Sequence, residues 1–259
     1  MKVTFLGICA NQTASYEAVS LIVDSGPISI LIDAGPGVVR QLQRAGRRCT
    51  EIAHVFITHS HGDHTLGFPY FVWNHFYEGL EGIKGPEKIH VYAFPRVNEG
   101  LDRMLSFCYD ITPYPFEVEY HALSEGGLDR VEIGETTVQT IPVDHTTPNY
   151  GLRVTHEGRS IAYSSDTIYH EGFAKLANGV DLLIHEAFVT KAQIALSRKV
   201  KHATAEDAGR CSTNCGAGAL ALVHLFPPHL EAPEVLIDEA KAASSCEVFL
   251  PEELMVRAV

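Results

Sequence analysis

Apolar and polar residues alternate in short segments along the whole chain, without low-complexity linkers or repeats. Apolar and β-branched segments predict strands over residues 2–8, 19–24, 28–34, 54–59, 88–94, 116–121, 137–145, 150–156, 160–166, 181–187 and 219–225. Helical patterns predict helices over residues 38–45, 66–77, 97–108, 172–177, 203–211 and 233–243. Because strands and helices alternate, we expect a layered α/β fold with a hairpin around Ser25, Gly26 and Pro27.

Several predicted strands end in residues that can bind metal ions. The strand over 54–59 leads into ITHSHGDH, and three later strands also end in a histidine or an aspartate. Imidazoles and carboxylates are costly to bury unpaired and suit borderline divalent ions such as zinc. On an extended turn His59 and His61 can share one ion, while Asp63 and His64 reach a second. The sequence therefore predicts a two-metal site formed by His59, His61, Asp63, His64, His145, Asp166 and His224.

Length and charge narrow the class of protein. The 259 residues suffice for one α/β domain with a full core, so we expect a single domain over residues 1–259. No apolar run reaches the length of a membrane span, and MKVTFLGICA enters a strand pattern without a signal peptide. We therefore expect a cytoplasmic protein without a membrane partner. A net charge of −12 argues against a broad phosphate-binding surface and against nucleic acid as a partner.

The stretch HSHGDH matches the HxHxDH motif of the metallo-β-lactamase-fold hydrolases, and the match continues in order through His145, Asp166 and His224. The chain therefore resembles this superfamily over nearly all of its length. The resemblance implies an αββα sandwich, in which two mixed sheets are flanked by helices and a dinuclear metal site lies between the sheet edges. It implies zinc as the usual metal, and manganese or iron is compatible with the same ligands.

Five further segments resemble the ribonuclease Z branch of that superfamily: LIDAGPGVVRQL, HTLGFP, VDHTTPNYGLRV, IHEAFV and KHATAEDAGR. The resemblance places Asp33 behind the metal site and His202 beside it, with Glu186 orienting His202. His202 would then contact a phosphate-like oxygen and protonate the leaving group. Taken by itself, His202 could instead be a residue of the N-cap region of the following helix. Glu186 could likewise be a surface acid at a strand end.

The resemblance also implies how the ions are held and used. His59, His61 and His145 bind one ion, Asp63, His64 and His224 bind the other, and Asp166 bridges the two. A hydroxide held between the ions is then the nucleophile, because coordination lowers the pKa of water towards neutrality. Asp63 accepts the proton of that hydroxide during attack.

One departure from the branch affects the predicted substrate. Members that process tRNA carry a long basic arm between the positions of His145 and Asp166. Only 20 residues separate these positions here, and two strands and their turn use all of them. We therefore expect no arm, and predict a hydrolase of small phosphodiesters with side activity on sulfate esters, phosphotriesters or lactones.

Other substrates and partners remain open. A ribonuclease Z-type tRNA 3′ endonuclease, and a lactonase or thioesterase of the same superfamily, share the seven metal ligands. Relatives in the branch are often dimers, which implies a homodimer. Trp73, Tyr109 and Tyr114 are candidates for an apolar mouth beside the metals, and packing within helices and loops is the alternative for them.

Overall fold

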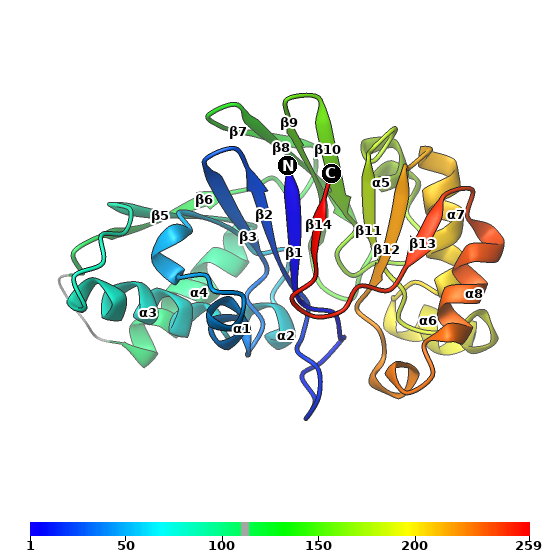
Figure 1. The fold of residues 1–259 in the computed structure, drawn as a ribbon, viewed down its shortest axis with the longest axis horizontal. Coiled ribbons are helices and arrows are strands. Elements are labelled where there is room, and N and C mark those ends of the chain that lie inside the picture. Colours follow the sequence, from blue (N-terminus) through cyan, green and yellow to red (C-terminus); the bar gives the residue numbers. More distant parts are fainter. Residues whose placement is uncertain (110–113) are drawn as a thin grey trace.

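The computed structural model describes residues 1–109 and 114–259 and contains two seven-stranded sheets flanked by helices (Figure 1). The first sheet has the order β14 (Val256–Ala258), β1 (Lys2–Gly7), β2 (Ser20–Ser25), β3 (Ile28–Ile32), β4 (His54–Phe56), β5 (Lys88–Ala93) and β6 (Glu117–Ala122). The second has the order β13 (Glu247–Phe249), β12 (Ala219–Val223), β11 (Leu182–Glu186), β10 (Arg159–Tyr163), β9 (Asn149–His156), β8 (Thr136–Val143) and β7 (Asp129–Ile133). This arrangement confirms the predicted αββα sandwich.

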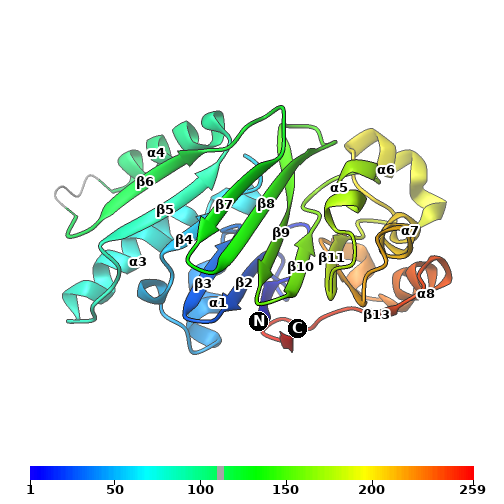
Figure 2. The same ribbon diagram turned by 90° about the horizontal axis from the view of Figure 1, so that it is seen from above.

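The helices lie outside the pair of sheets (Figure 2). The first half of the chain forms α1 (Val38–Arg44), α2 (Gly62–Thr65), α3 (Phe68–Leu80) and α4 (Pro95–Cys108), together with the short 3₁₀ helix at Cys49–Glu51. The second half forms α5 (Glu171–Leu176), α6 (Ile194–Val200), α7 (Ala205–Cys215) and α8 (Glu234–Ala243), with 3₁₀ turns at Lys191–Gln193 and Pro227–Leu230. Helix α4 contacts β5 and β6, whereas α7 contacts β11 and β12. Each sheet therefore has its own helical layer.

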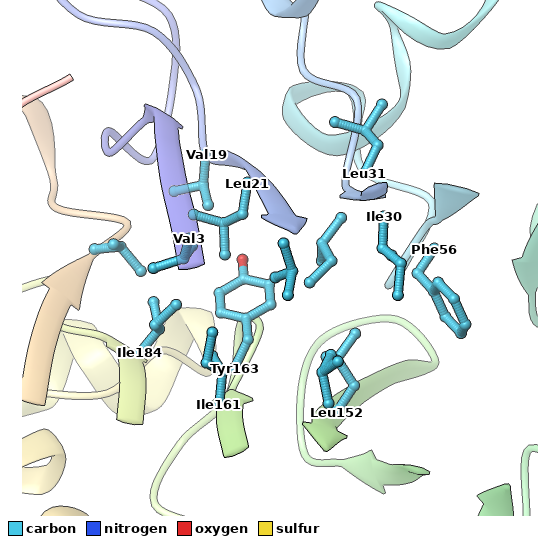
Figure 3. Close-up of a cluster of buried hydrophobic side chains, with 14 of the residues drawn as sticks. Val3, Val19, Leu21, Ile30, Leu31, Phe56, Leu152, Ile161, Tyr163 and Ile184 are labelled. Carbon is cyan, nitrogen blue, oxygen red and sulfur yellow. The ribbon is translucent and has the colours of Figure 1, made fainter. Parts of the chain in front are cut away.

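Apolar residues from both sheets fill the space between them (Figure 3). Val3 and Leu21 of the first sheet and Ile161, Tyr163 and Ile184 of the second are fully or almost fully buried. These strands read as apolar runs rather than as a strict alternation, because both faces of a central strand are covered in a layered α/β fold. The two sheets are thereby held in a fixed relation, on which a site built from both of them depends.

Strand directions bring several strand ends to one edge. Strands β3 to β6 of the first sheet and β10 to β13 of the second are parallel. Strand β8 is antiparallel to β9, and β9 is antiparallel to β10, so β8 and β10 run the same way. The carboxyl ends of β8, β10 and β12 therefore share one edge of the second sheet. The predicted hairpin at Ser25 is confirmed, since β2 and β3 pair there in antiparallel fashion.

Some element limits differ from those predicted. The strand predicted over 28–34 ends at Ile32, because Asp33 adopts a left-handed backbone with φ of 60°. The strand predicted over 54–59 ends at Phe56. Two residues later, the backbone N–H of Thr58 donates to the Asp33 carboxylate instead of to a neighbouring strand. The sequence did not predict β7, β13, β14, α2 or α6, of which β13 and β14 have only three residues each and α2 only four. Within the described residues, no helix combines the length and the apolar character needed to cross a bilayer.

Candidate metal centre

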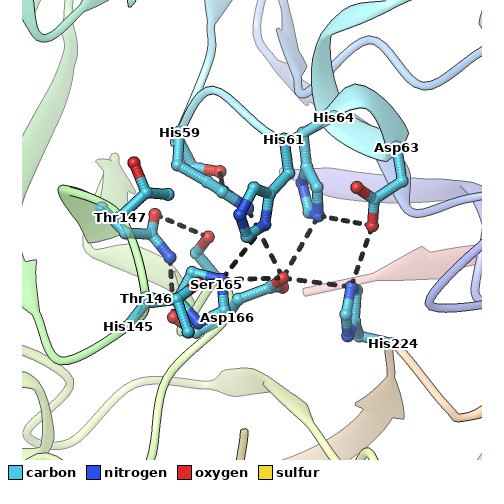
Figure 4. A network of polar contacts seen from close by, with 12 residues as sticks. His59, His61, Asp63, His64, His145, Thr146, Thr147, Ser165, Asp166 and His224 are labelled. Atoms are coloured by element: carbon cyan, nitrogen blue, oxygen red, sulfur yellow. Dashed lines mark hydrogen bonds and ion pairs between the residues drawn. The ribbon is translucent and has the colours of Figure 1, made fainter. Parts of the chain in front are cut away.

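The first side of the site follows β4 directly. After Phe56 the chain turns past His59, which is fully buried, and helix α2 begins at Gly62. This short helix places Asp63 and His64 one after the other, so that both side chains point towards the second sheet (Figure 4). One local segment thus presents four ligand-type side chains.

The second side of the site comes from three separate strand ends. His145 follows β8 by two residues, Asp166 follows β10 by three, and His224 directly follows β12. Because these strands end at one edge, the three side chains meet opposite α2 (Figure 4). Two backbone positions here, Ser165 and His224, have left-handed φ values of 54° and 56°. Such conformations are uncommon for residues other than glycine and cluster at functional sites.

Asp166 lies at the centre of the group. Its Oδ2 atom is 3.5 Å from the Nε2 atoms of His59 and His64, 3.8 Å from that of His145 and 3.2 Å from that of His224. The carboxylate is 1% exposed. One oxygen atom therefore faces four imidazoles from both sheets.

The seven residues form two overlapping sets of possible metal ligands. In each set one potential ligand atom per residue lies within 4.8 Å of all the others, and Asp166 belongs to both. The first set is His59, His61, His145 and Asp166, and the second is Asp63, His64, Asp166 and His224. Three or four imidazole and carboxylate ligands at this separation are what a zinc-like ion requires.

Unpartnered polar atoms test whether metal ions fit this place. The Nε2 atoms of His59 and His64 and both carboxylate oxygens of Asp166 are buried without a hydrogen-bond partner. Buried polar groups are nearly always hydrogen-bonded, so a cluster of buried polar atoms without hydrogen-bond partners that converge on one point has the character of a cation-binding site. The residues present therefore fit divalent metal ions.

The electrostatics of the cluster agree with this chemistry. Burial lowers the pKa of His145 to about 4 and also lowers the pKa of His59, so both imidazoles are neutral at pH 7 as metal ligands must be. Burial opposes ionisation of Asp166, but the neighbouring imidazoles of His224 and His64 outweigh it and hold the pKa of the carboxyl well below its usual range. An ionised carboxylate thus lies beside the neutral imidazoles of His59 and His145. His64 differs from them: burial would lower its pKa, but the carboxylates of Asp166 and Asp33 raise it well above its usual range, so a metal ion must displace a proton there.

Asp33 and Thr58 orient the first side from behind. The Oδ2 atom of Asp33 is 2.8 Å from Nδ1 of His64, which leaves Nε2 of His64 directed at the centre. The hydroxyl of Thr58 is 3.0 Å from an Asp33 oxygen and 3.0 Å from Nδ1 of His59. A carboxylate that binds the rear nitrogen of a ligand histidine fixes both its tautomer and its ring orientation. Asp33 therefore lies where the sequence resemblance implied, and Thr58 was not predicted.

One backbone carbonyl and one side-chain amide hold part of the second side. Nδ1 of His145 lies 3.0 Å from the carbonyl oxygen of Lys201, and the Asn149 side chain donates to the carbonyl of Asp166 at 2.6 Å. The sequence gives no signal for the first contact, because any residue can supply a backbone carbonyl.

His202 and Glu186 form a pair at the rim of the centre. Nδ1 of His202 lies 3.1 Å from Oε2 of Glu186, and the backbone N–H of Thr167 also donates to this carboxylate. Burial alone would lower the pKa of His202, but the charge and hydrogen bond of Glu186 raise it to about 9. Glu186 is fully buried, so it is not a surface acid.

A cavity of about 290 Å³ opens beside the cluster. His61, Asp63, Asp166, His202 and His224 line it, together with Ala10, Asn11, Phe188, Phe226 and Pro227. The ring of His202 stacks on Phe188 with 4.4 Å between centroids. A hollow of about 630 Å³ on α1 and α3 is larger but contains none of these residues. The convergence of ligands, rather than volume, marks the functional cavity.

Comparisons with known proteins agree with this geometry. A family model described as the beta-lactamase superfamily domain matches residues 29–225, which is most of the chain. The chain belongs to the beta-lactamase superfamily. It is therefore a metal-dependent hydrolase, and the family implies divalent metal ions at the His and Asp clusters described above.

Curated relatives of the chain carry the name of the predicted ribonuclease Z branch. The chain is 29% identical to the ribonuclease Z of Haloarcula marismortui, with 100% of this chain and 97% of that protein covered. Its fold is similar to human tRNase Z, short form, with a TM-score of 0.82, 23% identity and coverage of 100% and 99%. It is also similar to the metallo-beta-lactamase fold protein YhfI from Bacillus subtilis, with a TM-score of 0.84, 22% identity and coverage of 99% and 98%. The predicted resemblance to this branch is confirmed.

The expectation that excluded nucleic acid as a partner is wrong, because the relatives carry the names ribonuclease Z and tRNase Z. That expectation used the net charge of −12. Net charge averages the whole surface, whereas a substrate meets one local site, so a negative total does not exclude an anionic substrate.

The connection between β9 and β10 is short, as predicted. These two strands and the turn at Glu157 and Gly158 occupy most of the chain between His145 and Asp166. The alignment with the Haloarcula relative extends over 312 residues, whereas this chain has 259. That relative therefore carries insertions which this chain lacks.

The aromatic candidates for an apolar mouth lie elsewhere. Trp73 stacks on Tyr109 with 4.7 Å between ring centroids, and Tyr114 packs edge-on against Phe76. None of the three candidates lines the 290 Å³ cavity, and residues 110–113 between them lie outside the described residues. Packing around α3 accounts for these side chains.

Proposed function

We propose that the chain is a two-metal endoribonuclease of the ribonuclease Z type, which cleaves a phosphodiester near the 3′ end of precursor tRNA. The observation that carries this proposal is the position of Asp166 among four imidazoles, with His202 at the rim of the same cavity. The names of the relatives support RNA as the substrate. The prediction that small phosphodiesters are the main substrate gives way to this alternative.

In this proposal zinc is the metal, because the donors are mostly imidazoles. His59, His61 and His145 would hold one ion, Asp63, His64 and His224 the other, and Asp166 both. When bound, such ions activate water and stabilise negative charge on the attacking and leaving oxygens.

Three protein side chains would move or hold protons. Asp63 is ionised, because the hydrogen bonds and charges of His224 and His64 outweigh the effect of burial and lower its pKa. Its carboxylate lines the cavity and could accept a proton from the attacking water. His202 is protonated at pH 7, given its raised pKa, and would donate the proton on Nε2 to the leaving oxygen. Glu186 would position His202 by binding Nδ1.

The direct experiment is cleavage of a precursor tRNA with a 3′ trailer by metal-loaded protein. We expect one cut near the 3′ end, with a rate that falls steeply as salt rises. The Asp166→Ala variant is the control and should leave the precursor intact. An intact precursor in the presence of wild-type protein with two bound ions would contradict the proposal.

The short β9–β10 connection favours a second candidate function, the hydrolysis of small phosphodiesters, because no protruding element of the described residues is available there to grip a large RNA. A chromogenic phosphodiester separates the two. Turnover of this compound together with failure on precursor tRNA supports the second candidate. Failure on both, with two ions bound, contradicts both candidates and directs attention to the lactonase or thioesterase alternative.

A further inference from the structure

A second group of metal-ligand residues lies on the first sheet, apart from the centre. His90 lies on β5, and Glu119 and His121 lie on β6, the neighbouring strand. One potential ligand atom from each lies within 4.8 Å of the others, and the group shares no residue with the centre. His90 pairs in register with His54 at the beginning of β4, whereas the centre starts beyond the opposite end of that strand.

The separations within this group approach those of a coordination shell. Nδ1 of His90 and Nε2 of His121 are 3.0 Å apart. Oε2 of Glu119 lies 3.7 Å from the His90 nitrogen, and Oε1 of Glu119 lies 3.8 Å from the His121 nitrogen. Tetrahedral zinc with ligand distances of about 2.0–2.1 Å keeps its ligand atoms about 3.3 Å apart. The two imidazoles therefore need shifts of only a few tenths of an ångström, and rotation of the Glu119 carboxylate would let one of its oxygens share an ion with both.

Stacking holds both imidazoles in place. The ring of His90 stacks on His54 at 5.0 Å with an interplanar angle of 11°, and the ring of His121 stacks on Tyr92 at 4.6 Å with an angle of 15°. A preoriented pair of ligands loses little side-chain freedom when it binds an ion.

The group is also accessible. The side chains of His90, Glu119 and His121 are 27%, 36% and 34% exposed, so an ion can reach them from solution and retain a water ligand. The adjacent residues of β5, Ile89 and Val91, are fully buried, which places His90 on the opposite face of that strand.

We propose that His90, Glu119 and His121 bind a third divalent ion of the borderline class, such as Zn²⁺, Ni²⁺ or Cu²⁺. Two imidazoles and one carboxylate with an open fourth position form a donor set of the kind that binds these ions. The bound ion would link the edge strand β6 to its neighbour β5.

Lys88 competes with the ion for Glu119. Its Nζ atom lies 3.0 Å from Oε2 of Glu119 and 3.1 Å from a carboxylate oxygen of Glu117. Binding of the ion must displace Lys88 from Glu119, and Glu117 can retain it. The third ion should therefore bind more weakly than the two in the buried centre, and removal of Lys88 should strengthen its binding.

Metal stoichiometry tests this inference without an enzyme assay. The whole protein is dialysed against increasing Zn²⁺, and zinc per chain is measured by atomic spectroscopy. We expect the wild type to reach three ions, and His90→Gln and His121→Gln each to stop at two. Lys88→Ala should reach three at several-fold lower free Zn²⁺. His229→Gln, which removes an imidazole bonded to Gln193 away from both groups, is the matched control and should also reach three.

The possible outcomes separate this inference from the proposed function. A wild-type plateau at two ions would overturn it, and so would a plateau at three in both glutamine variants. Retention of two ions in those variants shows that the centre is still folded, whatever substrate the protein cleaves. Because the two variants lie on different strands, loss of folding in one leaves the other as a test.

Discussion

The two sides of the metal centre are built in different ways. On the first side one segment after β4 supplies His59, His61, Asp63 and His64, and side chains behind it fix their orientation. On the second side His145, Asp166 and His224 come from three strand ends, and a backbone carbonyl, a side-chain amide and uncommon backbone conformations position them. The first side is therefore set by local sequence, whereas the second depends on the register of a whole sheet.

This difference predicts different responses to mutation. A change behind the first side alters one hydrogen-bonded network and should weaken metal binding by degrees, because Asp33 and Thr58 act through the ligands. A change at Asp166 removes a group that all four neighbouring imidazoles share. The largest effects should therefore come from the second side, and substitutions graded by position can test this.

The Asp166→Ala variant should have the largest effect. It removes the carboxylate that both ligand sets share, so we expect loss of bound metal and a fall in phosphodiesterase rate of about 10³-fold or more, since several kcal/mol of charge stabilisation disappear. Zinc content and turnover are measured together. Asp238→Ala, which changes an exposed aspartate on α8, should alter neither. Full metal content in Asp166→Ala would show that Asp166 is not a bridging ligand.

The His202→Ala variant should come next, with metal content unchanged. Loss of a general acid lowers rates by about 10²–10⁴-fold. The loss should be large for an RNA or alkyl diester and small for a p-nitrophenyl diester, whose leaving group needs no proton. An equal loss on both kinds of substrate would show that His202 acts in binding rather than in proton donation.

The Asp33→Asn variant should have a smaller effect, on metal affinity rather than on chemistry. Asn tolerates the left-handed backbone at this position but cannot accept hydrogen bonds from both Thr58 and His64 as the carboxylate does. Groups that orient metal ligands typically contribute 10–100-fold in affinity, so we expect a loss of about that size in chelator competition. Tyr163→Phe, which removes a hydroxyl 3.5 Å from Asp33, is the control and should change affinity much less. Equal zinc affinity in Asp33→Asn and wild type would show that Asp33 does not support metal binding.

The same difference explains what could be predicted from sequence. The first side is contiguous, so HSHGDH alone indicated metal, and resemblance added Asp33. The second side could be inferred only because strand ends carried His145, Asp166 and His224 in order. The contact of the Lys201 carbonyl with His145 could not be inferred, because it depends on chain path rather than residue type.

Fold prediction succeeded and failed for related reasons. Apolar, almost fully buried strands such as β2 and β11 carry their own signal, and they were predicted close to their observed limits. Strands β13 and β14 have three residues each and exist because β12 and β1 present open edges to them. The group at His90, Glu119 and His121 was missed because each residue alone is an ordinary polar position in a strand, and only the β5–β6 register brings them together.

The Thr58→Val variant should have the smallest effect and gives the closest test of the two-sided comparison. Valine keeps the shape of threonine but removes the hydroxyl that links the Asp33 carboxylate to His59. A hydrogen bond to a charged group contributes about 1.5–3 kcal/mol, and we expect about 1 kcal/mol of this to reach the metal, because Thr58 acts only through His59. We expect a loss in zinc affinity of about fivefold, and Thr58→Ser, which keeps the hydroxyl, should lose less. Since Asp33 still holds His64, the first side should tolerate this change. If Thr58→Val weakens zinc binding as much as Asp33→Asn, the first side is as interdependent as the second.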